Sequence, residues 1–317
     1  MKPDGWHNPP SLAFHLVLVA AIFALNTQAL RSAAQTNATV SIPTGKLAFV
    51  TSKGFGSAGK IHVIAGERRI TTLAYTTRGL EFLPDGKRII YSANDTETNG
   101  VFIYDLKHHA STALLANVAG AEAPSLSPDG SKIAFEVYQE GRKSSQIYTA
   151  KADGSEVKQL TEGPYYNWTP RWSPDGKQLV FETTRNDNPD NHVQNGGHRD
   201  IYLMDGDGQN QTNLTSNAYG HHPAWSPDGK FIAYMAHGGV WVMKADGSAK
   251  QNISHGKTRD SEPAWSPDGE WIAFTRTANN SPDAAMDIWI MKSDGTEQRQ
   301  VTFNKTDFDS YSPSWAK

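Results

Sequence analysis

A short motif recurs five times along the chain, and it constrains the fold more than any other feature of the sequence. Its core is Pro-Asp-Gly followed by an apolar run. Successive copies begin at Leu83, Ser127, Ser173, Ser226 and Ser266. The residue before each copy is Phe, Leu or Trp, and Trp315 takes the same place near the C-terminus, with spacings of 44, 46, 53, 40 and 50 residues. Such periods are typical of the blades of a β-propeller.

The letters of the motif are those that a tight turn requires. Pro presets φ at the second turn position, Asp can bond neighbouring backbone amides, and Gly supplies a positive φ. A second turn, such as residues 245–248 (ADGS), follows later in each repeat. The runs between the turns are apolar, or place an aromatic on one face as in residues 288–291 (IWIM), which is typical of strands packed between neighbouring blades. Each repeat therefore predicts four antiparallel strands.

The two ends of the chain supply parts of one blade. Residues 46–52 correspond to the second strand of a repeat, and residues 311–317 correspond to a first strand. Residues 46–77 supply three strands and the C-terminal strand supplies the fourth, with five complete repeats between them. The sequence therefore predicts an all-β fold over residues 44–317, a six-bladed propeller closed by pairing the C-terminal strand with the N-terminal blade.

Composition excludes several classes of function. Lys and Arg number 30 against 33 Asp and Glu, a formal net charge of −3, so the chain lacks the basic excess that nucleic-acid binding needs. Cysteine is absent, which excludes disulfides, thiolate metal sites and cysteine nucleophiles. Residues 54–59 match G-x-G-x-x-G, but they lie between predicted strands with no helix to receive a pyrophosphate. We therefore expect no nucleic-acid partner and no cofactor.

The N-terminus has the pattern of a signal peptide. Residues 12–25 form an apolar run interrupted only by His15, and this run is shorter than a membrane span. Small residues follow, and cleavage is expected after Ala34, with Ala29 as the next choice and an uncleaved anchor as the alternative. We therefore predict a signal peptide over residues 1–34, a linker over 35–43, a periplasmic or secreted monomer, and no transmembrane segment after cleavage.

Variation between the repeats is concentrated at one side of the predicted ring. In a four-stranded blade, the loop between the second and third strands emerges on the same face as the connections between blades. That face, here called the loop-variable face, carries the long insert at residues 186–200 and the loop at residues 278–287. The Pro-Asp-Gly turns occupy the opposite face. We expect function on the loop-variable face, because binding residues are concentrated on variable loops.

Two positions just before the Pro of each first strand are expected to ring the channel mouth. The first position is occupied by Arg78, Glu122, Trp168, His221, Ser261 and Tyr311. The second is occupied by Gly79, Ala123, Thr169, His222, Glu262 and Ser312. The predicted partner-binding residues are Arg78, Glu122, Tyr165, Tyr166, Trp168, Tyr219, His221, His222 and Tyr311. The alternatives are that Thr169 and Glu262 merely cap strands, and that Tyr165 and Tyr166 pack within their own loop.

Histidines on the same face allow a metal site as an alternative. His198, His221 and His222, together with His192 and Glu262, offer imidazole and carboxylate ligands that suit Zn or Mn. Adjacent strand residues point apart, however, so His221 and His222 would rarely bind one ion together. The competing interpretation is that these histidines are solvated or line the channel.

The repeated unit W-S-P-D-G-K-x-I-A-F, with its later I-Y-x-M-x-x-D-G, resembles the TolB-type, WD-like propellers of bacterial envelopes over about residues 44–317. TolB itself has an additional N-terminal domain, for which the residues before the first strand leave no room. Propellers of the dipeptidyl peptidase type are also similar, but a hydrolase domain follows theirs. The resemblance implies a non-catalytic scaffold that binds a protein or peptide in the envelope. The alternative is a metal-dependent carbohydrate lyase or hydrolase, since oligogalacturonate lyases use a metal-binding propeller.

Overall fold

A computed structural model describes most of the chain beyond residue 41. The described residues are 42–54, 59–66, 68–76, 78–94, 99–115, 118–139, 141, 144–186, 198–216, 219–256, 259–277, 279, 284–304 and 308–317. The predicted signal peptide and almost all of the predicted linker lie outside this set. Within the described residues, no helix is long and apolar enough to cross a membrane.

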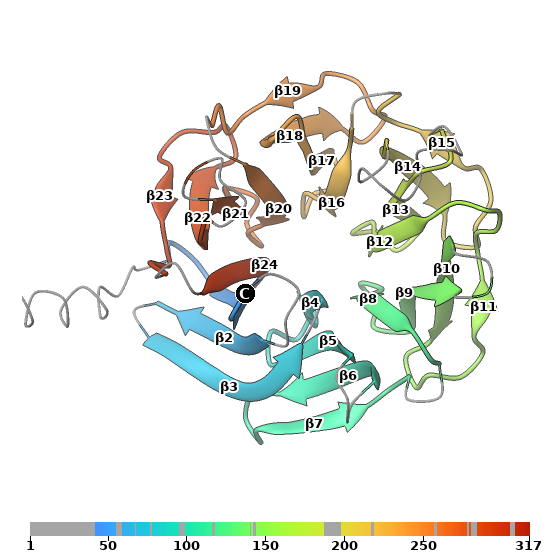
Figure 1. The fold of residues 1–317 in the computed structure, drawn as a ribbon, viewed down its shortest axis with the longest axis horizontal. Coiled ribbons are helices and arrows are strands. Elements are labelled where there is room, and N and C mark those ends of the chain that lie inside the picture. The colour runs from blue at the N-terminus through green and yellow to red at the C-terminus, as the bar shows by residue number, and fades with distance from the viewer. Residues whose placement is uncertain are drawn as a thin grey trace, which may run out of the picture. The chain divides into compact units, whose positions relative to one another are not determined.

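The strands form six four-stranded antiparallel sheets arranged as blades in a ring (Figure 1). Blade 1 contains β1 (Lys46–Ser52), β2 (Gly59–Ala65), β3 (Arg68–Thr76) and β24 (Asp309–Ala316). Blade 2 contains β4 (Arg78–Phe82), β5 (Arg88–Asn94), β6 (Asn99–Asp105) and β7 (Ala110–Ala113). Blade 3 contains β8 (Ala121–Leu126), β9 (Lys132–Gln139), β10 (Ser144–Lys151) and β11 (Lys158–Gln159).

The remaining blades have the same order of strands. Blade 4 contains β12 (Asn167–Trp172), β13 (Gln178–Thr183), β14 (Asp200–Asp205) and β15 (Thr212–Asn213). Blade 5 contains β16 (His221–Trp225), β17 (Phe231–Ala236), β18 (Gly239–Lys244) and β19 (Gln251–Asn252). Blade 6 contains β20 (Asp260–Trp265), β21 (Trp271–Thr277), β22 (Met286–Lys292) and β23 (Arg299–Gln300). The predicted six-bladed, all-β fold is confirmed.

Blade 1 closes the ring as the sequence predicts. β24 pairs with β1, placing Trp315 opposite Leu47 and Ser310 opposite Thr51. The Trp315 indole donates a hydrogen bond to the carbonyl oxygen of Thr44, at 2.8 Å. Pairing of the two ends removes the free sheet edges that an open ring would expose.

The Pro-Asp-Gly turns are held by their own side chains. In blade 5 the Ser226 hydroxyl donates to Asp228 at 2.7 Å, and it also accepts the backbone N–H of Phe231 at 2.9 Å. Gly229 has a φ of 71°, which explains why the motif requires glycine there. The Trp that precedes the motif in several repeats is mainly a core residue, as expected. In blade 4, for example, Trp172 is 6% exposed and packs with Ala134 of blade 3 and Phe181 of its own blade.

Every inner strand contains a bulge at the residue before its Pro, or before Leu80, which takes the place of that Pro in blade 2. Each strand shifts register there against its neighbour. The bulged residues are Gly79, Ala123, Thr169, His222, Glu262 and Ser312, with φ between 47° and 63°. Five of the six are not glycine, although such backbone usually costs a non-glycine residue of the order of 1 kcal/mol or more. The bulge therefore belongs to the blade architecture and redirects the side chains that face the channel.

Strand register fixes which ends share a face. In blade 4, Thr183 at the end of β13 lies opposite both Asn167 at the start of β12 and Asp200 at the start of β14. The insert between β13 and β14 therefore emerges beside the start of the inner strand. The Pro-Asp-Gly turn between β12 and β13 lies at the other end, as predicted for the loop-variable face.

Candidate ligand-binding channel

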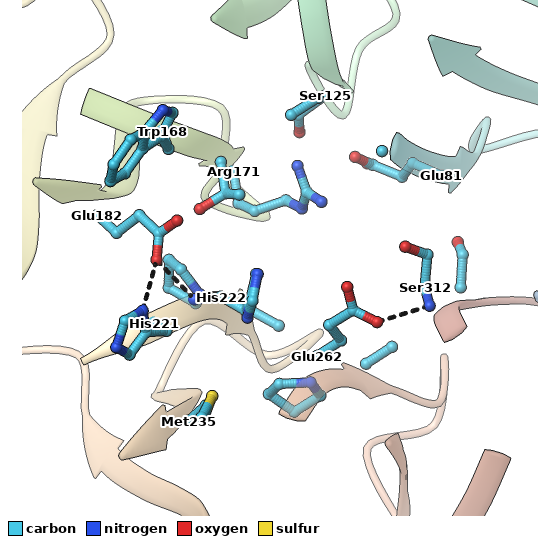
Figure 2. Close-up of a pocket in the computed structure, with 18 of the residues that line it drawn as sticks. Glu81, Ser125, Trp168, Arg171, Glu182, His221, His222, Met235, Glu262 and Ser312 are labelled. Atoms are coloured by element: carbon cyan, nitrogen blue, oxygen red, sulfur yellow. Dashed lines mark hydrogen bonds and ion pairs between the residues drawn. The ribbon is translucent and has the colours of Figure 1, made fainter. Parts of the chain in front are cut away.

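A cavity of about 950 Å³ occupies the centre of the ring. Residues of all six inner strands line it, including Glu81 of β4, Ser125 of β8, Trp168 of β12 and Ser312 of β24 (Figure 2). Ligand sites in proteins commonly have volumes of roughly 300–1,000 Å³. The cavity is therefore large enough to hold part of a ligand.

Most of the predicted ring residues with described side chains line this cavity. The ring positions that line it are Gly79, Ala123, Trp168, Thr169, His221, His222, Glu262, Tyr311 and Ser312. The candidate residues Tyr219 and His198, which are not ring positions, line it as well, whereas Ser261 does not. Glu122, Tyr165 and Tyr166 are not among the lining residues. Arg78 begins β4, but its side chain is outside the description, and His192 lies outside the described residues altogether.

A buried carboxylate organises the loop-variable end of the channel. Glu182 is 2% exposed, and its Oε1 lies 3.3 Å from Nη1 of Arg199. Its Oε2 lies 3.5 Å from Nδ1 of His221 and accepts the backbone N–H of His222 at 3.3 Å (Figure 2). Glu182 and Arg199 belong to blade 4, and both histidines belong to blade 5. One carboxylate therefore links two blades at the channel mouth.

The charge states of this cluster follow from its surroundings. Burial opposes ionisation of Glu182, but the Arg199 charge and the contact with His221 outweigh it and hold the pKa of this carboxyl well below its usual range. Burial lowers the pKa of His222, although the Glu182 and Glu262 carboxylates act in the opposite direction. The site at neutral pH therefore contains an ionised Glu182 beside a neutral His222 imidazole.

Three aromatic rings stack in a row that leads to the cavity. The rings of Tyr138 and Tyr166 are 6.5 Å apart, and those of Tyr166 and Trp168 are 4.8 Å apart. The Arg199 guanidinium lies over the Trp168 ring, 4.2 Å from its centre. We call Tyr138, Tyr166 and Trp168 the aromatic row. It begins at Tyr138, which is 50% exposed, and ends on a residue that lines the channel.

Two of the predicted tyrosines have roles other than the expected one. Tyr311 is a predicted partner-binding residue, but it is 1% exposed and packs in the core between blades 1 and 2. Its ring is buried because β24 is an inner strand pressed against blade 2. Tyr165 packs against Arg185, whose guanidinium carbon lies 5.6 Å from the centre of the Tyr165 ring. Tyr219, by contrast, is 50% exposed.

The bulges explain what Thr169 and Glu262 do. Glu262 Oε2 accepts the backbone N–H of Ser312 at 2.7 Å and the Thr275 hydroxyl at 3.1 Å. The backbone N–H of Thr169 donates to Glu136 Oε2 at 2.8 Å. The Glu262 bonds match the strand-capping alternative, but the Thr169 hydroxyl has no hydrogen-bond partner among the described residues and caps nothing there. In both cases a carboxylate of one blade receives the bulge N–H of the next blade.

The described histidines are not gathered into a metal site. His198 Nε2 lies 3.6 Å from Asp200, and its ring lies 4.5 Å from that of Tyr219. The rings of His221 and His222 are 6.3 Å apart. Among the described residues, no group of three or more His, Asp or Glu side chains could hold a metal ion. The metal alternative therefore finds no support in the part of the chain that the structure covers.

Sequence reasoning missed charged residues of the channel wall, including Glu81, Glu136, Arg171, Glu182 and Arg199. A signal was present for two of them. Glu136 and Glu182 end the apolar run after the Pro-Asp-Gly turn, where other repeats have Ser92, Met235 and Thr275. A charged residue at a position that is otherwise small or apolar indicates a buried partner.

Six four-stranded blades around a polar channel define a six-bladed β-propeller. Residues 26–239 match the TolB beta propeller domain, PD40, and the chain belongs to this family. It is 30% identical over 200 residues to an uncharacterized protein of Agrobacterium fabrum, a match that covers 61% of this chain and 67% of that protein. The predicted family resemblance is confirmed, and a propeller of this family fits a scaffold or binding role.

Solved structures show the same fold. TolB from Acinetobacter baumannii has a TM-score of 0.67 at 22% identity, over 86% of this chain and 66% of that one. A putative TolB from Agrobacterium tumefaciens has a TM-score of 0.63 at 20% identity, over 84% of this chain and 98% of that one. At these identities the likeness concerns the fold alone.

The expectation that the chain is not an enzyme is contradicted by its relatives. It is 28% identical over 189 residues to YuxL of Bacillus subtilis, an uncharacterized peptidase, and 26% identical over 152 residues to dipeptidyl-peptidase 5 of Porphyromonas endodontalis. The matches cover 49% and 46% of this chain, but only 29% and 20% of those relatives. A puromycin hydrolase and an oligogalacturonate lyase with manganese share the fold, with TM-scores of 0.51 and 0.52 at 16% and 18% identity. Related propellers therefore occur in enzymes, and this fold is no argument against catalysis.

Proposed function

We propose that this propeller binds a protein or peptide ligand at the channel mouth on its loop-variable face. The observation that carries the proposal is the aromatic row, which leads from the exposed Tyr138 to Trp168 at the lining of the cavity. Aromatic and arginine side chains near the centre of an interface commonly dominate binding. Both kinds of side chain are present at Trp168, because the Arg199 guanidinium lies over the Trp168 ring.

The mouth is also built to hold its shape. The carboxylate of Glu182 fixes Arg199, His221 and the backbone of His222 at once. Side chains that are already ordered lose little conformational entropy when a partner arrives. The opposite face is made of near-identical turns such as Ser226–Gly229, which offer little to distinguish one blade from another.

The proposed compartment is the periplasm or the outside of the cell. Support comes from the apolar run at residues 12–25, followed by small residues at Ser32–Ala34. Membership of the TolB propeller family agrees with this location. In that compartment a propeller without cysteine keeps its fold independently of the redox state.

Capture of partners from an envelope extract tests the proposed binding face. The purified chain is immobilised beside its Trp168→Ala and Lys230→Ala variants, and captured proteins are identified by mass spectrometry. Lys230 is the control, because it lies beside a Pro-Asp-Gly turn and forms an exposed ion pair with Asp228. We expect Trp168→Ala to lose specific partners that wild type and Lys230→Ala retain. Full retention by a folded Trp168→Ala protein would refute the assignment of this face.

A further inference from the structure

We propose that the interior of the channel binds a carboxylate group of the ligand, held by Arg171 with Glu81 and His222 beside it. This inference rests on the proposed binding function and adds the chemistry that the ligand must present. The carboxylate would belong to a peptide, either as its C-terminal group or as an Asp or Glu side chain. All three residues line the 950 Å³ cavity (Figure 2).

Arg171 is a cation whose hydrogen-bonding capacity is largely unused. A guanidinium has five N–H donors in a planar fork that matches a carboxylate. Arg171 donates one hydrogen bond within the described residues, from Nη1 to the carbonyl oxygen of Pro170 at 2.9 Å. No described carboxylate forms an ion pair with it, whereas Arg199 pairs with Glu182 and Arg276 pairs with Asp260. Arg171 therefore has donors available to an anion inside the cavity.

Glu81 faces the same space in a form suited to an acidic ligand. Burial raises the pKa of this carboxyl, against the Arg171 charge and a hydrogen bond with Ser125. Its Oε2 is buried and has no hydrogen-bond partner among the described residues. A raised pKa favours the protonated carboxyl, which donates one hydrogen bond, so Glu81 can support a bound carboxylate beside Arg171. His222 Nδ1 is likewise buried without a partner among those residues.

The other acidic residues of the channel are already bonded to the protein. Glu182 pairs with Arg199, Glu136 accepts the backbone N–H of Thr169, and Glu262 accepts that of Ser312. Their charges are thus held toward the channel wall by neighbouring blades. Arg171 differs from them because its guanidinium points across the channel toward Ser125 and Glu81 (Figure 2). Arg259 also lines the cavity, but it is exposed, whereas Arg171 is half-buried. Arg171, and not the bonded carboxylates, is therefore the group placed to receive a ligand in the interior of the channel.

Three matched peptide arrays test the carboxylate requirement. One set has free C-termini and no Asp or Glu, the second has amidated C-termini with Asp or Glu, and the third has no carboxylate at all. Labelled wild-type protein is compared with Arg171→Met, Glu81→Gln and Arg299→Met. Arg299 is the matched control, because it is exposed on the outer strand of blade 6, where it stacks on Trp271. Melting curves verify that each variant is folded.

We expect wild type to bind one or both carboxylate sets and not the third, and which set binds identifies the source of the carboxylate. Arg171→Met should weaken that binding by about tenfold or more, as loss of a charged hydrogen-bonding partner does. Glu81→Gln should stay within about threefold of wild type, because the amide keeps a donor. Arg299→Met should match wild type.

Equal binding to all three sets, or no carboxylate-dependent binding at all, would overturn the inference. So would loss of binding in Glu81→Gln with none in Arg171→Met, since that pattern indicates a cationic ligand. If Arg171→Met does not fold, amidating the C-terminus of a bound peptide, or changing its Asp and Glu to Asn and Gln, makes the same test on wild type. Partners captured through Trp168 without any dependence on a carboxylate would leave the proposed function standing and refute only this inference.

Discussion

Glu182 and Arg199 face each other across the base of the blade 4 insert, with Oε1 and Nη1 3.3 Å apart. The carboxylate is fully enclosed, and the guanidinium stacks on Trp168. The same carboxylate also contacts the start of β16 in blade 5. A single buried pair therefore joins the insert, the aromatic row and the next blade.

Replacing Glu182 with Gln should lower the free energy of unfolding by about 2 to 3 kcal/mol at pH 7, because Arg199 loses its buried partner. Thermal melting of the purified protein measures this loss. Glu156→Gln is the control, since Glu156 belongs to an exposed ion pair with Lys151 and exposed pairs contribute little. An equal effect of the two substitutions would contradict the role given to Glu182.

The contribution of Glu182 should depend on pH in a defined direction. Its pKa in the folded protein is held below the usual range, so its stabilising effect is present above about pH 4.5 and is lost as the pH falls further. The difference in melting temperature between wild type and Glu182→Gln should therefore be largest near neutral pH and shrink in acid. A difference that grows on acidification would contradict the direction of the shift.

Deleting residues 311–317 should disrupt closure of the ring. The deletion removes most of β24, exposes the edge of β1 and takes Trp315 from the core. We expect insoluble expression or loss of cooperative unfolding by calorimetry. Removal of Lys317 alone is the control, because that residue is exposed and lies beyond the strand. A truncated protein that melts within a few degrees of wild type would refute closure by this pairing.

Thr169→Gly should be tolerated although it places glycine in a strand. Thr169 has a φ of 49°, and its hydroxyl is buried without a hydrogen-bond partner among the described residues. Relief of the positive φ should offset the usual glycine penalty of about 1 kcal/mol. Thr183→Gly, at a fully buried residue of β13, serves as the matched control and should lower the melting temperature. Equal destabilisation by both would refute strain at the bulge.

Once a partner is identified, Trp168→Ala should weaken its binding by about 1 to 3 kcal/mol, and Tyr166→Ala by a similar amount. Titration calorimetry measures the affinity. Lys230→Ala should change it by less than about 0.5 kcal/mol. If Tyr166 only packs its own loop, its substitution would lower the melting temperature along with the affinity, so melting curves accompany each titration.

Leu18→Asp should retain the precursor in the cytoplasm, because it places a charge within the apolar run at residues 12–25. Cell fractionation with immunodetection follows the precursor and the mature chain. Leu18→Ile keeps the run apolar and is the control. Unchanged fractionation of Leu18→Asp would count against a signal peptide.

The architecture could be predicted from the order of residues, because the information for a blade is local. The Ser-Pro-Asp-Gly turn, for instance at Ser226–Gly229, sets where two strands meet, and the apolar runs set which faces are covered. The chain begins with the second strand of a repeat and ends with a first strand. This was enough to predict that residues 311–317 complete the blade that begins at residue 46.

Which side chains enter the channel, and which partners neutralise their charges, depends on contacts between distant segments. Simple alternation predicted that His221 and His222 point apart, yet both line the cavity, because the bulge at His222 breaks the two-residue period. Tyr311 occupies a ring position in the sequence but is buried against blade 2. Glu182 finds Arg199 and the start of blade 5 only when distant segments meet, since pairing of buried charges depends on separations in space that the order of residues does not encode.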